Sequence, residues 1–199
     1  GKYKAVFFDV GGTLLTVYPS VGEVYAAHAR SFGFAGDPED VDKRFLLEWR
    51  HSGGIESLGK HGGEQAEKGF WRDVVFKVFE PFGGVRDFDV YFERVFEAFK
   101  SKEHWRIFED VLESRVLENL RRKGIALGVI SNWDSRLRTI LENVGLAHHF
   151  DFILASAVVG SAKPDDKIFR KALRKSGVAA ADACHIGDEF NCDYVGANN

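Results

Sequence analysis

Polar residues that could do chemistry follow short apolar runs at three places in the chain. Asp9 comes after the first run, Ser131 and Asn132 after the second, and Asp188 after the third, five residues before Asp193. Two or three carboxylates with nearby backbone carbonyls suit a hard divalent ion, above all Mg²⁺. A carboxylate at the end of a buried segment is costly unless it is paired, hydrogen-bonded or metal-bound. The alternative for Asp9 alone is a side chain that only bonds the following turn.

Lys163 adds a positive charge to this set of residues. A serine hydroxyl, an asparagine amide and a lysine ammonium can together surround an anion, and a phosphoryl group suits them best. The carboxylate nearest to such an anion could attack it directly. The candidate chemistry is therefore phosphoryl transfer, if the fold brings these residues together.

The apolar runs themselves predict the elements that position these residues. Strands are expected at 5–10, 125–130, 152–155 and 183–186, and the run at 125–130 is typical of a strand buried on both faces of a parallel sheet. Helical patterns separate the later strands, which indicates right-handed crossovers and a doubly wound parallel sheet. The carboxyl ends of parallel strands lie along one edge, where ligands bind. His185, inside the last run, is interpreted as a core histidine.

The segment 16–103 has a different pattern, without strand-like alternation. Ser20 and Glu23 have the spacing of a capping box, and Pro38 stands at the first position of a second helix. Helices are predicted near 20–32, 38–53, 64–80 and 88–99. We therefore expect an α/β protein with a discontinuous core domain, residues 1–15 and 104–199, and an inserted all-helical domain of four helices, residues 16–103.

A glycine-rich loop joins the second and third predicted helices. It has five glycines in the thirteen residues 51–63, and it also contains Lys60 and His61. Glycines make such a loop adaptable, and binding residues are often found on loops of this kind. Lys60 and His61 are therefore candidate substrate-binding residues, although a simple solvated connection explains the same pattern.

Composition excludes several classes of partner. The 199 residues carry a formal charge of −3 with a pI near 6.2, which gives no reason to expect nucleic acid. No apolar run approaches the length of a membrane span, and no signal peptide precedes the first strand. The two cysteines, Cys184 and Cys192, lack a Cys-x-x-Cys pattern and are expected to be reduced thiols. We therefore expect a cytoplasmic protein without a membrane partner.

Four motifs lie on these elements in order along the chain. They resemble the four motifs of the haloacid dehalogenase (HAD) superfamily and cover nearly the whole sequence. The resemblance implies a Rossmann-like core, and the insertion after the first motif is similar to the helical cap of subfamily I. The motifs are Asp9-x-Gly11-Gly12-Thr13-Leu14, Ile130-Ser131-Asn132, Lys163-Pro164-Asp165 and Gly187-Asp188-x-x-x-x-Asp193.

The resemblance implies a nucleophile and a metal site. Asp9 would attack the substrate, form an aspartyl-phosphate and also bind Mg²⁺. The backbone carbonyl of Gly11 and the carboxylate of Asp188 would be further ligands. Asp193 would orient the metal shell or complete it.

The resemblance also implies a phosphate site for a small phosphorylated substrate. Ser131 and Asn132 would hold the phosphoryl oxygens, and we place Gly12 and Thr13 in the same phosphate-binding set. Lys163 would offset the negative charge that nucleophile and substrate share.

One position departs from the phosphatases of the superfamily. They usually carry a second Asp two residues after the nucleophile, which protonates the leaving group, and here that residue is Gly11. We expect phosphatase-type hydrolysis with a proton taken from water, from the substrate or from the cap loop. The alternatives are a dehalogenase-type or phosphonatase-type hydrolase, and a phospho-ligand-binding module with impaired catalysis. A metal-free dehalogenation would not require Asp188 and Asp193.

Overall fold

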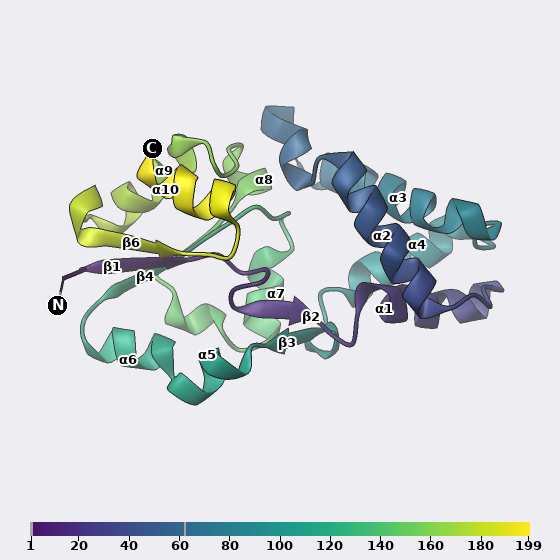
Figure 1. Cartoon of the computed structure of the whole chain (residues 1–199), viewed down its shortest axis with the longest axis horizontal. Helices are drawn as coiled ribbons and strands as arrows, with labels where there is room; N and C mark the ends of the chain where they lie inside the picture. Colours follow the sequence, from purple (N-terminus) through teal and green to yellow (C-terminus); the bar gives the residue numbers. More distant parts are fainter. Residues whose placement is uncertain (1, 62) are drawn as a thin grey trace.

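The protein is described here by a computed structural model that covers residues 2–61 and 63–199. Its centre is a four-stranded parallel sheet with the strand order β5-β4-β1-β6 (Figure 1). The strands predicted from the apolar runs are all present, with ends that differ from the prediction by at most two residues. Their bounds are β1 Ala5–Phe8, β4 Ala126–Ser131, β5 Phe152–Ala155 and β6 Ala183–Ile186.

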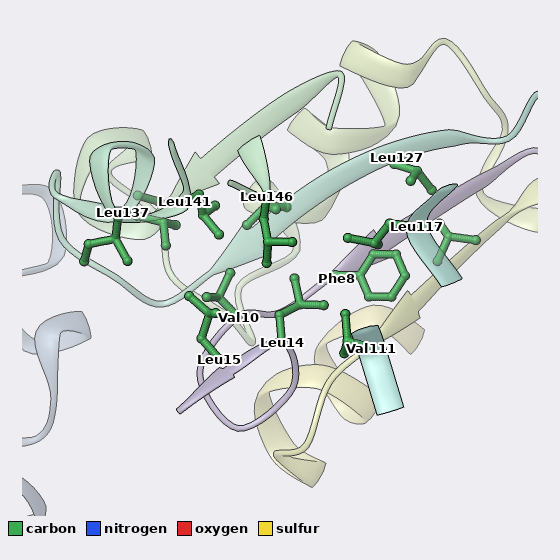
Figure 2. Close-up of a cluster of buried hydrophobic side chains, with 14 residues drawn as sticks. Phe8, Val10, Leu14, Leu15, Val111, Leu117, Leu127, Leu137, Leu141 and Leu146 are labelled. Atoms are coloured by element: carbon green, nitrogen blue, oxygen red, sulfur yellow. The ribbon is translucent and has the colours of Figure 1, made fainter. Parts of the chain in front are cut away.

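Alternate residues of β1 face opposite sides of the sheet. The strand therefore contributes to two hydrophobic clusters, one on each face. Val6 and Phe8 pack on one side with leucines of two helices (Figure 2), and Ala5 and Phe7 pack on the other side. Helices thus cover both faces, which confirms the doubly wound fold. The helices that flank the sheet are α5 Glu109–Ser114, α6 Val116–Arg122, α7 Leu137–Asn143, α8 Ser156–Val159, α9 Asp166–Ser176 and α10 Gly196–Asn198.

The expected helices between residues 16 and 103 are also present. They pack around an aromatic cluster of their own that includes Tyr25, Phe79 and Tyr91. In Figure 1 these helices lie beside the sheet. We call this unit the helical module. Its helices are α1 Val21–Ala29, α2 Pro38–Ser52, α3 Glu64–Phe79 and α4 Phe88–Ala98. Its division from the rest of the chain at 15/16 and 103/104 stays a prediction.

Local sequence signals begin and end these helices. The Ser20 hydroxyl accepts a hydrogen bond from the Glu23 N–H at 3.1 Å, as the capping box predicts, and Asp37 caps α2. Gly53 ends α2 in the left-handed conformation, with φ 71°. No helix of the described residues is both long and apolar enough to cross a bilayer.

Two short strands that the sequence did not reveal join the helical module to the sheet. β2 Leu15–Val17 leads into α1, and it pairs antiparallel with β3 Trp105–Ile107, which leads back from α4. Short 3₁₀ and π-helical turns complete the fold. They are η1 Arg30–Phe32, η2 Ile55–His61, η3 Glu80–Phe82, η4 Lys102–His104, η5 Ala147–His149, η6 Ala180–Asp182 and the π-helical η7 Phe190–Val195.

Candidate active site

Asp9 lies directly after β1, and its backbone N–H donates to the Ile186 carbonyl of β6 at 2.8 Å. Its Oδ1 atom is 3.1 Å from the Lys163 Nζ atom, so the two groups form an ion pair by distance. The same oxygen is buried and accepts no hydrogen bond of good geometry from the described residues. This buried oxygen therefore depends on the charge of Lys163 for its stabilisation.

Lys163 is the positive centre of the site and is only 3% exposed. Its ammonium contacts Asp9 on one side and Asp193 on the other, where Nζ lies 2.5 Å from Oδ1. The Asn132 side chain fixes its backbone, because the amide Nδ2 donates to the Lys163 carbonyl at 2.9 Å and Oδ1 accepts from the Lys163 N–H at 2.8 Å. The structure therefore places Asn132 as the residue that positions Lys163; its contact with a phosphoryl group stays a prediction.

Asp193 holds the ammonium group of Lys163 in place through their ion pair. Its Oδ1 also contacts the His185 Nε2 atom at 2.8 Å, and its Oδ2 accepts from the Glu189 N–H at 2.9 Å. Burial alone would raise the pKa of Asp193, but hydrogen bonds from His185, Lys163 and the Glu189 backbone outweigh it and hold the pKa well below its usual range. Asp193 is therefore ionised. Through its Nε2 contact with Asp193, His185 is part of the site as well as of the core, while its Nδ1 atom is buried without a partner in the described chain.

Asp188 completes the acidic group at the sheet edge. Asp188 is exposed as a residue, but partial desolvation of its carboxyl group, and next the negative charge of Asp9, raise its pKa. Its Oδ1 accepts a hydrogen bond from the Thr13 hydroxyl at 3.2 Å. Gly12 has φ 73°, and a Cβ atom there would lie 2.2 Å from Asp188 Oδ2, so only glycine lets the two segments approach.

The carboxylates of Asp9, Asp188 and Asp193 each offer an oxygen within 4.8 Å of the others. These hard oxygen donors fit a Mg²⁺ ion. A cation there would also relieve the repulsion between Asp9 and Asp188. Both oxygens of Asp193 already accept hydrogen bonds. Asp193 is therefore better suited to hold Lys163 in position than to bind the metal directly.

A cavity of about 560 Å³ opens from these carboxylates toward the helical module. Most of the predicted site residues line it, but Thr13 and Asp193 do not. The side chains of Lys60 and His61 lie outside the described part of the structure. The predicted residues at the cavity wall are Asp9, Gly11, Gly12, Ser131, Asn132, Lys163 and Asp188.

The loop between α2 and α3 also reaches the cavity. Ile55 and Glu56 of η2 belong to its lining. Burial raises the pKa of Glu56, the neighbouring charge of Glu189 raises it further, and Lys163 opposes the shift. The sequence singled out this loop for its glycines, but it gave no reason to select Glu56.

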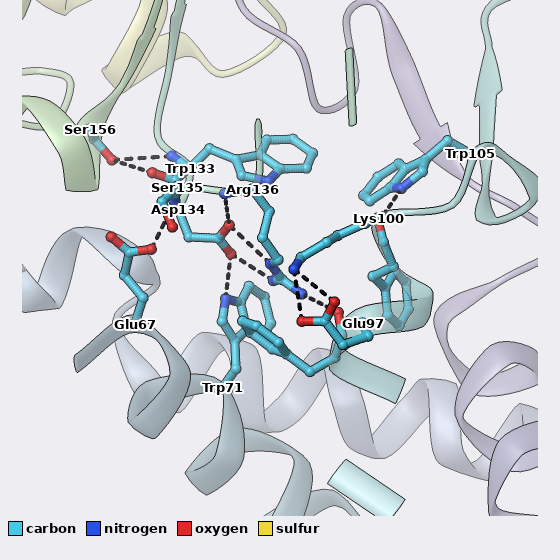
Figure 3. A network of polar contacts seen from close by, with 12 residues as sticks. Glu67, Trp71, Glu97, Lys100, Trp105, Trp133, Asp134, Ser135, Arg136 and Ser156 are labelled. Atoms are coloured by element: carbon cyan, nitrogen blue, oxygen red, sulfur yellow. Dashed lines mark hydrogen bonds and ion pairs between the residues drawn. The ribbon is translucent and has the colours of Figure 1, made fainter. Parts of the chain in front are cut away.

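A polar clasp joins the helical module to the loop after β4 (Figure 3). The fully buried Asp134 carboxylate accepts hydrogen bonds from the Trp71 indole at 2.7 Å and from the Arg136 guanidinium at 2.6 Å. Arg136 also donates to the Phe96 carbonyl at 3.0 Å, and Glu67 accepts from the Ser135 N–H at 2.8 Å. These contacts hold the module over the cavity.

Gly11 faces an aromatic ring in place of a second acid. A Cβ atom built on Gly11 would lie 3.3 Å from Cζ3 of Trp133, the residue that follows Asn132. The indole of Trp133 therefore covers the side of Gly11 from which an aspartate side chain would extend. Sequence reasoning missed this residue, although its position directly after Ser131 and Asn132 was a usable signal.

Comparisons with known proteins agree with this geometry. The haloacid dehalogenase-like hydrolase family matches residues 3–199. Haloacid dehalogenase-like hydrolase domain-containing protein 3 of Mus musculus is 37% identical over 200 residues, which cover 98% of this chain and 78% of that protein. The chain therefore belongs to the haloacid dehalogenase-like hydrolases.

Solved structures of two kinds of hydrolase are similar over almost the whole chain. A 2-haloacid dehalogenase from Pseudomonas syringae pv. Tomato is 29% identical, with a TM-score of 0.64 and coverage of 98% of this chain and 82% of that one. A HAD phosphatase from Thermococcus onnurineus is 26% identical, with a TM-score of 0.62 and coverage of 98% and 81%. Membership in the superfamily thus leaves two chemistries to be separated by the site.

Proposed function

We propose that this hydrolase is a Mg²⁺-dependent phosphatase that acts on a small phosphorylated molecule through a phosphoryl intermediate on Asp9. The observation that carries the proposal is the cluster of Asp9, Asp188 and Asp193, each of which offers a carboxylate oxygen within 4.8 Å of the others, with the buried Lys163 between Asp9 and Asp193. Like charges at such distances repel one another, and a divalent cation would offset the charge of these carboxylates and part of the charge of a phosphoryl group bound beside them.

The residues divide the reaction between them. An oxygen of Asp9 attacks phosphorus, the bond from phosphorus to the ester oxygen breaks, and the alcohol oxygen leaves. Water then attacks phosphorus and breaks its bond to Asp9, which releases inorganic phosphate and restores the carboxylate. Lys163, held by Asn132 and Asp193, offsets the charge that accumulates beside Asp9. Mg²⁺, held by Asp9, Asp188 and the Gly11 carbonyl, would neutralise phosphoryl oxygens.

The leaving oxygen obtains no proton from residue 11. Glycine stands there and the Trp133 ring covers it, so the proton comes from water or from another group at the cavity wall. General acid catalysis contributes about 10²- to 10⁴-fold. Esters whose leaving groups need little protonation should therefore react much faster than alkyl esters.

The test is hydrolysis of 4-nitrophenyl phosphate and of a 2-haloacid by the same preparation, with and without Mg²⁺. We expect release of phosphate only in the presence of Mg²⁺, and no release of halide. The Asp9→Asn variant should be inactive. Mg²⁺-independent halide release, or phosphate release that survives Asp9→Asn, would overturn the proposal.

One observation favours dehalogenation as a second candidate. Halide leaves without a proton, and an aromatic ring beside the nucleophile in place of an acid suits such a leaving group. The acidic cluster argues against it, because displacement of halide by Asp9 has no need for Asp188 beside it. The halide assay above separates the two chemistries. Binding of phosphate mimics without turnover of any ester would instead support the binding module.

A further inference from the structure

All four tryptophans of the chain line the cavity that holds Asp9. They come from segments far apart in the sequence, and each is half-buried, with part of the ring left accessible at the cavity wall. A role in the core alone does not require this convergence. The tryptophans are Trp49 of α2, Trp71 of α3, Trp105 of β3 and Trp133 after β4.

The rings form two pairs. Trp49 stacks on Trp71 with 5.3 Å between ring centroids and 13° between planes, and Trp105 packs against Trp133 at 5.3 Å and 51°. The indole N–H groups of Trp71 and Trp105 donate to Asp134 and to a backbone carbonyl, which fixes those two rings. Because Trp133 also borders Gly11, aromatic surface begins next to the nucleophile.

The charges at the cavity wall set a second constraint on the ligand. Among the described residues that line it, the cations are Lys163 and Arg136. Lys163 is paired with Asp9 and Asp193, and Arg136 with the buried Asp134. The described wall therefore offers no unpaired cation to a second anionic group, such as a carboxylate, on the part of the substrate beyond the phosphate.

We propose that the alcohol part of the substrate is a flat aromatic group that packs against Trp133 and against the edge of Trp49, which is itself stacked on Phe45 and Trp71, so that the enzyme selects phosphate monoesters of aromatic alcohols. This inference rests on the phosphatase function proposed above. An aromatic contact of this kind favours an aromatic over a saturated ring by about 3- to 10-fold in affinity.

The experiment compares benzyl phosphate with cyclohexylmethyl phosphate in the presence of Mg²⁺. The two esters have similar size and similarly poor leaving groups, so the comparison separates aromaticity from leaving-group activation. We expect kcat/KM to favour benzyl phosphate by about 3- to 10-fold. Trp133→Leu and Trp49→Leu should each bring the ratio toward one. Phe76→Leu is the control, since Phe76 lies on α3, is 47% exposed and does not line the cavity.

Binding of benzylphosphonate and cyclohexylmethylphosphonate, followed by tryptophan fluorescence, provides a readout without turnover. Since every tryptophan borders the cavity, we expect a change in emission and tighter binding of the aromatic compound. Equal affinities for the two phosphonates, or a preference that survives both tryptophan variants in folded protein, would overturn the inference. Absence of hydrolysis together with the expected phosphonate preference would instead overturn the phosphatase function and leave the aromatic site standing.

Discussion

The two walls of the cavity are built in opposite ways. In the polar wall, Asp9 and Asp188 come just after the neighbouring strands β1 and β6, and Lys163 lies in the turn between α8 and α9. The aromatic wall takes Trp49 and Trp71 from the helical module and its other two tryptophans from β3 and the loop after β4. A rigid sheet edge thus holds the groups that require fixed distances, while separate helices shape the space for the rest of the substrate.

The walls meet at Gly11, where their difference has a chemical consequence. An acid at that position would belong to the polar wall, but the Trp133 ring extends the aromatic wall to this point. The polar wall therefore carries out nucleophilic attack and charge neutralisation, and the aromatic wall selects the leaving group. Variants on each side should change different kinetic quantities.

The largest effect is expected from breaking the polar wall at its centre. Lys163→Met removes the cation between Asp9 and Asp193 and leaves a buried carboxylate uncompensated. We expect kcat on 4-nitrophenyl phosphate to fall by about 10²- to 10³-fold and the free energy of unfolding to fall by about 3–5 kcal/mol. Lys167→Met is the matched control, because that lysine side chain is 66% exposed. Full activity of Lys163→Met would remove this lysine from the mechanism.

The next effect tests the point where the walls meet. Gly11 does not have a positive φ, so Gly11→Asp introduces no backbone strain. The Trp133 ring has to move by a few tenths of an ångström to admit the Cβ atom, and the carboxyl group then extends past its edge. The new carboxyl group should raise kcat/KM for alkyl phosphates by up to about 10²-fold and change aryl phosphate turnover much less.

The matched variant for Gly11→Asp is Gly12→Asp. It combines φ 73° with a Cβ atom 2.2 Å from Asp188, and it should lose activity on both kinds of ester. An unchanged ratio of aryl to alkyl rates in folded Gly11→Asp would show that protonation of the leaving group is not what the polar wall lacks.

A smaller effect should follow from removing one hydrogen bond of the polar clasp, which holds the helical part of the aromatic wall in position. Glu67 is 2% exposed and accepts from the Ser135 N–H across the clasp. Glu67→Ala removes a hydrogen bond to a charged group, worth about 1.5–3 kcal/mol. We expect KM to rise about 10-fold with little change in kcat, since the polar wall is untouched. Glu64→Ala, an exposed position on the same helix, should match the parent protein. A loss confined to kcat would contradict the division between the walls.

The smallest effect is thermal stabilisation by the metal. Mg²⁺ at about ten times its Kd stabilises the folded chain by about 1.4 kcal/mol, which corresponds to roughly 3–6 °C in Tm for a chain of this size. Asp188→Asn should abolish the shift without unfolding the protein, because Asp188 is exposed. EDTA should reverse the shift in the parent protein. An equal shift in Asp188→Asn would place the metal elsewhere.

Much of the polar wall could be predicted from the sequence, because Asp9 and Asp188 come just after recognisable apolar runs and Lys163 begins a predicted helix. The runs predicted the strands, and the parallel sheet brings their ends together. Asp9, Asp188 and Asp193 lie close to one another, with Lys163 between Asp9 and Asp193, while their catalytic roles stay predictions. The role of Asn132 in positioning Lys163 could not be predicted from the sequence. Its amide bonds the backbone of a residue 31 positions away, and no local pattern reports a contact of that kind.

The aromatic wall could not be predicted, for the same physical reason. Periodicity shows which face of a helix is apolar, but not which of its aromatic residues turn toward a cavity shared with another part of the fold. β2 and β3, of three residues each, are too short for their alternation to be distinguished. The convergence of Trp49 and Trp133 depends on which way the helical aromatic residues turn and on how β2 and β3 join the helical module to the sheet.

The most direct test of the account is a search for the phosphoryl group on Asp9. The protein with Mg²⁺ and excess 4-nitrophenyl phosphate is quenched in acid within a turnover, and its intact mass and peptides are measured. The account predicts that a fraction of the protein gains one phosphoryl group, located on the peptide that contains Asp9, and that Asp9→Asn gains none and releases no phosphate. Phosphate release at the parent rate by Asp9→Asn, or a phosphoryl group found on another residue, would contradict it.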